Sequence, residues 1–137
     1  MKQLLITVVI LGSTFFTFGQ TIEDKQAVIQ MSIDLDELQN YYHDNEEEDR
    51  KPLFICDNGI VPSTLELSKF GEPVHFMPKK DLFFTNKQAF LDFEKFQISE
   101  TSAAVDFQYK VEGIAIELTF EKTNGSWIID TKKLTEK

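Results

Sequence analysis

Two adjacent tyrosines and one distant histidine are the side chains best suited to acid–base chemistry. Tyr41 and Tyr42 follow one another, and His75 lies between Val74 and Phe76. Tyrosine and histidine are common proton-transfer groups in enclosed active sites, so these three residues, with an aspartate, form a candidate catalytic pocket. The plainer interpretation is that Tyr42 completes an apolar helix stripe, Tyr41 meets water at an interface and His75 points to solvent.

Nucleophiles and metal ligands are sparse. Cys56 is the only cysteine and ends the apolar run 53–56; this setting predicts a buried small hydrophobe, with a nucleophile or a dimer-linking thiol as the alternative. His43 and the acids at 44 and 46–48 could bind a hard cation, but calcium loops need an interleaved glycine, which this run lacks. HExxH, CxxC, GxSxG, P-loop and GxGxxG motifs do not occur. The sequence therefore predicts no catalytic residue, no metal site and no cofactor.

Phenylalanine is unusually frequent, with 13 copies in the chain. Five of them lie between positions 83 and 96, beginning with the pair Phe83 and Phe84. A hydrophobic core is the default interpretation, and an apolar binding groove is the alternative, because aromatic side chains line ligand pockets and anchor interfaces. With Tyr41, Tyr42 and His75, Phe83 and Phe84 complete the set of candidate ligand-binding residues.

Residues 1–19 have the pattern of a secretory signal peptide. Lys2 precedes an uncharged apolar run, which ends among small and polar residues at Gly19. The strictly apolar part is too short to span a bilayer, although a retained membrane anchor is the alternative. No cysteine lies near the predicted cleavage point before Gln20, so no lipid anchor is expected. We expect a single mature domain, residues 20–137, exported to the periplasm or the medium without stable membrane anchoring.

The chain is acidic, with 23 Asp and Glu against 14 Lys and Arg and a net charge of −9. Such a surface repels phosphate backbones and anionic lipid head groups, which argues against nucleic-acid and membrane-surface roles. It favours solubility, or else a basic partner or a cation. Residues 44–51 contain five acids within six positions and are predicted to form an acidic surface loop.

The segment from Thr21 to Tyr42 has the spacing of an amphipathic helix. Its apolar side chains recur at intervals of three and four: Val28, Met31, Leu35, Leu38 and Tyr42. Thr21 and Asp24 form a start that resembles a capping box. Between residues 32 and 43 the pattern also allows a shorter helix followed by a turn.

The last third of the chain alternates apolar and polar residues. Segments 103–111 and 114–121 keep a period of two, which predicts strands with one buried and one wet face. Asn124 and Gly125 supply the turn of a tight hairpin. Between 53 and 77 only short extended pieces are expected, at 53–56, 64–67 and 74–77.

A further strand is predicted over residues 90–98. Simple alternation places Phe90, Phe96 and Ile98 on one face and Leu91 and Phe93 on the other. The helix and these strands predict an α+β fold, in which an N-terminal amphipathic helix packs on a curved antiparallel sheet with a C-terminal β-meander.

Three short segments resemble small exported proteins of unknown function from Bacteroidetes-type bacteria. These are Ser-Lys-Phe-Gly-Glu-Pro-Val at 68–74, Asp-Leu-Phe-Phe at 81–84, and Leu-Thr-Phe-Glu-Lys-Thr-Asn-Gly-Ser-Trp at 118–127. The order of elements over residues 22–135 is similar to NTF2-like and cystatin-like α+β folds. NTF2-like folds host enzymes and pure binding modules, so the resemblance selects no function. A single main helix, where NTF2-like enzymes have several, departs from an enclosed catalytic cone.

These observations together predict an exported, soluble binding or interaction module without catalytic activity. Its partner is expected to be a protein or an apolar small ligand, not a nucleic acid. The alternatives are an NTF2-like enzyme that uses a Tyr/His/Asp pocket and an acidic inhibitor of a basic hydrolase. A deep pocket that holds a histidine would favour the enzyme, and an exposed aromatic patch would favour the binding module.

Overall fold

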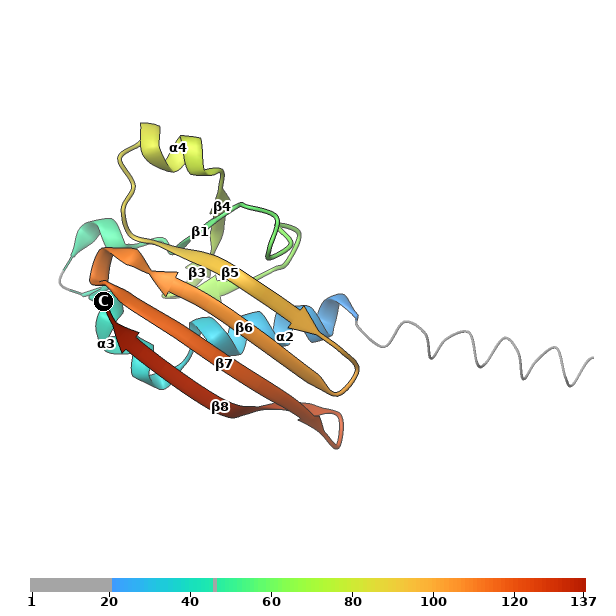
Figure 1. Ribbon diagram of the computed structural model, residues 1–137. Coiled ribbons are helices and arrows are strands. Elements are labelled where there is room, and N and C mark those ends of the chain that lie inside the picture. Colours follow the sequence, from blue (N-terminus) through green and yellow to red (C-terminus); the bar gives the residue numbers. More distant parts are fainter. Residues whose placement is uncertain (1–20, 46) are drawn as a thin grey trace, which may run out of the picture.

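The computed structural model describes residues 21–45 and 47–137, so the predicted signal peptide at 1–19 lies outside the described residues. The fold is α+β, as predicted, with few and short helices beside one six-stranded sheet (Figure 1). The helical elements are α2 (Ile22–Ile33), η2 (Asp36–Leu38), α3 (Gln39–Tyr42), η3 (Glu48–Arg50), α4 (Lys79–Phe84) and η4 (Lys110–Glu112). The strands are β1 (Phe54–Cys56), β2 (Ser68–Lys69), β3 (Glu72–Pro73), β4 (His75–Met77), β5 (Phe90–Ile98), β6 (Ser102–Tyr109), β7 (Ile114–Thr123) and β8 (Ser126–Glu136).

The main sheet is mixed, with the strand order β4-β1-β5-β6-β7-β8. Strands β5 to β8 form the predicted antiparallel meander. Strand β1, however, runs parallel to both of its neighbours, β4 and β5, so the prediction of a wholly antiparallel sheet is wrong. Parallel neighbours require a connection that carries the chain back to its starting end. The breaker-rich segment 57–74 and the α4 segment provide these two return connections.

The N-terminal helix begins as predicted and ends earlier. Thr21 and Asp24 form a reciprocal capping box at the start of α2. The helix ends at Ile33, and the extended backbone of Leu35 separates it from η2 and α3. The Tyr42 hydroxyl donates to the Ile33 carbonyl at 2.8 Å, which satisfies an acceptor that the broken helix leaves free. The apolar side chains of the predicted helix stripe still face the core, because the chain turns at the break without exposing them.

A β-bulge in β5 changes which side chains of this strand face the core, so the facing predicted from simple alternation is wrong. The register shifts between Phe93 and Lys95, so one extra residue enters the strand and the alternation changes phase. Leu91 and Phe93 are fully buried, and Phe96 and Ile98 pack half-buried against the same core. The prediction that these two pairs face opposite sides is therefore wrong. Simple alternation holds only while the strand stays regular.

The core lies between the meander and the N-terminal helix, which crosses behind the long strands in Figure 1. Phe107 and Leu118 are buried and Glu117 is exposed, as the alternation predicts. Asn124 and Gly125 both have positive φ, 52° and 78°, the geometry expected for the β7–β8 turn. Among the described residues, no helix has the length and apolar character needed to cross a bilayer.

One buried carboxylate joins the helix to the far hairpin. Asp24 accepts hydrogen bonds from the Lys122 ammonium at 2.8 Å and from the Trp127 indole N–H at 3.0 Å. Burial alone would raise the pKa of Asp24, but these bonds outweigh it and lower the pKa from its usual value of 3.8. The ionised carboxylate is therefore part of the folded structure.

Candidate functional site

The two tyrosines of the predicted pocket point in different directions. Tyr42 is fully buried, its ring packs edge-on against Tyr109 at 5.4 Å, and burial raises its pKa well above the usual value. Tyr41 instead donates from its hydroxyl to the Glu136 carboxylate at 2.8 Å. Tyr42 therefore completes the helix stripe, and Tyr41 binds the last strand of the sheet.

His75 and Tyr41 lie toward opposite edges of the sheet. His75 belongs to β4, one edge of the sheet, whereas the Tyr41 partner Glu136 belongs to β8, the opposite edge. The His75 side chain is exposed and stacks on the Phe54 ring at 5.5 Å. The fold thus places the three residues of the predicted acid–base set apart from one another.

The surroundings of Cys56 and of the described residues in the acidic segment favour structural roles. Cys56 is buried, as predicted, and burial raises the pKa of its thiol, which disfavours the reactive thiolate. Arg50 of the acidic segment is buried, and its guanidinium donates to the Glu112 carboxylate at 2.9 Å. Within residues 21–45 and 47–137, no group of three or more histidine, cysteine or acidic side chains is arranged to hold a metal ion.

Phe83 and Phe84 are the most exposed large apolar side chains of the described residues, at 81% and 80%. They lie side by side on α4, with ring centroids 6.2 Å apart. The core interpretation of the phenylalanine cluster is therefore wrong for this pair. The reason is that α4 has only six residues and uses Leu82, which is buried, as its anchor, so the next two side chains face outward.

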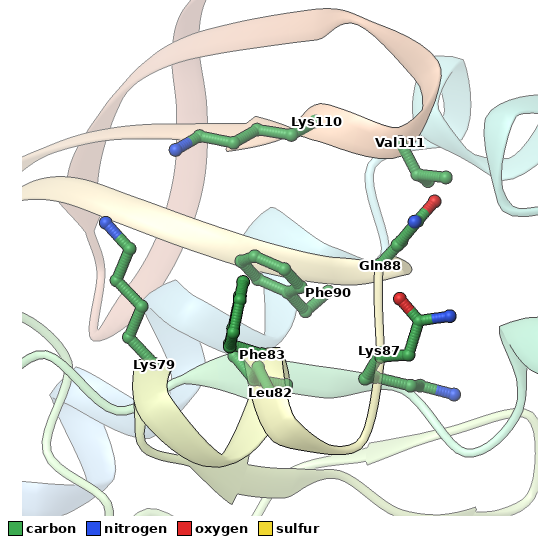
Figure 2. Close-up of a pocket in the computed structure, with 9 residues that line it drawn as sticks. Lys79, Leu82, Phe83, Lys87, Gln88, Phe90, Lys110 and Val111 are labelled. Atoms are coloured by element: carbon green, nitrogen blue, oxygen red, sulfur yellow. The ribbon is translucent and has the colours of Figure 1, made fainter.

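A groove of about 510 Å³ lies between α4 and the chain around η4. Its apolar side chains are Leu82, Phe83, Phe90 and Val111. Figure 2 shows the Phe83 ring directed toward the Phe90 ring, with Val111 farther along the same opening. Because Phe83 is largely exposed, an apolar body bound in the groove would bury part of its ring.

Three lysines line the same groove, and none of its lining residues is acidic. Lys110 pairs with Asp92 at 2.9 Å, beside the opening. Lys87 donates to the backbone carbonyl of Asp49 and lies 4.7 Å from the centre of the Phe54 ring. Burial lowers the pKa of Lys87.

Lys79 differs from Lys110 in having no carboxylate partner among the described residues. No ion pair joins it to a carboxylate within the part of the chain that the structure describes. In Figure 2 its side chain rises from the start of α4 beside the Phe83 and Phe90 rings, on the same side as the amine of Lys110. The groove therefore combines an aromatic surface with an available cation.

Sequence patterns point to only part of this groove. Phe83 is among the predicted ligand-binding residues, but Lys79, Lys87 and Lys110 are not. Lys79 and Lys87 flank the phenylalanine pair in the sequence, a signal that could have been noticed. Nothing in the sequence places Lys110 beside them, since it follows a different strand.

Comparisons with known proteins place the chain in no established group. No protein-family model matches it. No curated protein and no solved structure is significantly similar to it either.

Proposed function

We propose that this protein is an exported, non-catalytic binding module whose ligand occupies the groove between α4 and η4. The observation that carries the proposal is Phe83, an 81% exposed aromatic ring that forms one wall of a groove of about 510 Å³. Ligand sites in proteins commonly have this size and this mixture of apolar walls with a few polar groups. Export rests on the signal-peptide pattern of residues 1–19.

The arrangement supports binding more than acid–base catalysis. The groove contains no histidine and no carboxylate among its lining residues. His75 and Tyr41 lie toward opposite edges of the sheet, so a Tyr/His/Asp pocket would need a different fold. An apolar small ligand is the occupant that we favour over a protein partner, because the groove volume of about 510 Å³ matches one small molecule.

The test uses the neutral dye N-phenyl-1-naphthylamine, whose fluorescence rises in apolar sites. We expect it to bind the purified protein, and Phe83→Ser to weaken binding about fivefold, because the dye loses roughly 1 kcal/mol of apolar contact. The matched control is Phe84→Ser, which removes an equally exposed ring from the same helix without touching the groove.

Circular dichroism of both variants checks that the fold is unchanged. The control should keep the dye affinity within about twofold, as is usual for surface substitutions. If the dye does not bind, or if the two serine variants weaken it equally, the groove is not the binding site and the proposal is wrong.

A further inference from the structure

The charges around the groove point to a more specific ligand, if the proposed binding function holds. We infer that the ligand is an amphipathic organic acid with one anionic group. Its acid group pairs with the ammonium of Lys79, and its aromatic or alkyl body lies over the rings of Phe83 and Phe90. This inference rests on the proposed function and adds the chemical class of the ligand.

The first argument is the contrast between the groove and the rest of the protein. The chain carries a net charge of −9, yet the groove is lined by three lysines and by no acid. An anion is repelled by most of the surface and meets a favourable potential only where such lysines gather. A neutral apolar ligand would gain nothing from this arrangement.

The second argument is the number of cations that remain available. Lys110 is neutralised by Asp92 at 2.9 Å, whereas the Lys87 amine donates to the uncharged Asp49 carbonyl, remains a cation and extends to the far side of the rings in Figure 2. Lys79 has no such partner within the described residues. On the Lys110 side of the rings Lys79 is therefore the one ammonium without a carboxylate partner among the described residues, and it matches one negative charge, so a monoanion fits this side better than a phosphate-rich polyanion.

The third argument is the relative placement of charge and aromatic surface. In Figure 2 the amines of Lys79 and Lys110 lie on one side of the Phe83 and Phe90 rings, and Lys87 extends to the other side. An acid group held at Lys79 therefore leaves the attached apolar body over the two rings. The groove volume of about 510 Å³ accommodates one small molecule of this kind.

Two dyes with the same aromatic body separate the charge from the apolar contact. 1-Anilinonaphthalene-8-sulfonate carries one sulfonate, and N-phenyl-1-naphthylamine is its neutral counterpart. We expect Lys79→Gln to weaken the sulfonate dye about fivefold, the usual upper effect of one exposed ion pair, and to leave the neutral dye unchanged. Added salt should weaken only the sulfonate dye.

Lys80→Gln is the matched control, because Lys80 is exposed on the same helix but does not line the groove. It removes the same charge and should change neither dye more than about twofold. Decanoate should displace the sulfonate dye at a lower concentration than decanol does, which extends the test from a sulfonate to a carboxylate.

The outcomes distinguish this inference from the proposed function. If Phe83→Ser weakens the neutral dye but Lys79→Gln leaves the sulfonate dye unchanged, the groove binds apolar ligands and the organic-acid inference is wrong. The same conclusion follows if both glutamine variants weaken the sulfonate dye equally. If Phe83→Ser affects neither dye, both the inference and the proposed function are wrong.

Discussion

The strongest test of the architecture is removal of the Asp24 carboxylate. Asp24→Ala breaks the capping box with Thr21, the ion pair with Lys122 and the hydrogen bond from the Trp127 indole. These contacts link the first turn of α2 to residues about a hundred positions later in the chain. No other described side chain connects the helix start to the β7–β8 hairpin so directly.

The cost of Asp24→Ala follows from the groups that lose a partner. A lost helix N-terminal capping interaction costs about 1 kcal/mol, and a buried N–H without an acceptor, here that of Trp127, costs about 1–3 kcal/mol. Lys122 is 26% exposed and can return to water, so it adds little. We expect a loss of about 3 kcal/mol in the free energy of unfolding, against a total of about 5–15 kcal/mol for a domain of this size.

Urea unfolding followed by the fluorescence of Trp127, the only tryptophan, measures this loss. With a slope of about 1.5 kcal/mol per molar urea, the midpoint should fall by about 2 M. Glu23→Ala is the matched control, because Glu23 lies in the same helical turn but is exposed. Equal midpoints for the two variants would refute the view that Asp24 joins helix to sheet.

The pH dependence gives the same prediction an independent check. The pKa of Asp24 is lowered in the folded protein by the bonds from Lys122 and Trp127, which outweigh the effect of burial. Its contribution is therefore complete above the unfolded-state pKa and is lost as the pH falls through the folded-state pKa. The stability difference between the wild type and Asp24→Asn should shrink as the pH falls below 3.8. A constant difference across this range would contradict the assigned charge state.

Two further outcomes are expected from substitutions in the sheet and beside it. Phe107→Ser, at a fully buried position, should lower the free energy of unfolding by about 3–5 kcal/mol. The variant should therefore be unfolded, or its urea midpoint should fall by more than about 2 M. Glu117→Ser on the solvent-exposed face should leave the midpoint nearly unchanged. Glu112→Gln should lower the free energy of unfolding by about 2 kcal/mol in the same assay, because it removes the closer of the two carboxylates that pair with the buried guanidinium of Arg50 and leaves only the exposed Asp49 at 3.7 Å. Glu117→Gln, which removes an exposed carboxylate 3.9 Å from Lys133, is the control. Equal losses at positions 112 and 117 would contradict the structural role of the Arg50 pair.

Structural features that depend only on residues close together in the sequence were predictable. The period of two across 103–111 and 114–121 predicts the buried face of the meander, and Phe107 and Leu118 lie on that face, although β6 already ends at Tyr109. The capping box at Thr21 and the Asn124–Gly125 turn were predictable for the same reason. Each depends on backbone geometry within a few positions, which the amino-acid types determine directly.

Other features depend on contacts that no local pattern contains. The bulge after Phe93 changes the phase of β5 because pairing with β6 decides the register. The helix ends at Ile33, and its last carbonyls are satisfied from later residues: the Leu35 N–H donates to Ser32 and the Tyr42 hydroxyl donates to Ile33. A continuous apolar stripe cannot distinguish this broken helix from a straight one, since both bury the same side chains.

The sequence by itself determined the α+β class, the buried faces of β6 and β7 and the aromatic character of Phe83. Only the tertiary structure decided that Phe83 is exposed and that Lys79 and Lys110 lie beside it. Lys79 and Lys110 belong to segments 31 positions apart in the printed numbering. They meet because the α4 return connection places β5 next to β1 and brings the end of β6 alongside. A binding groove built from such distant segments is set by the path of the chain, which residue spacing does not encode.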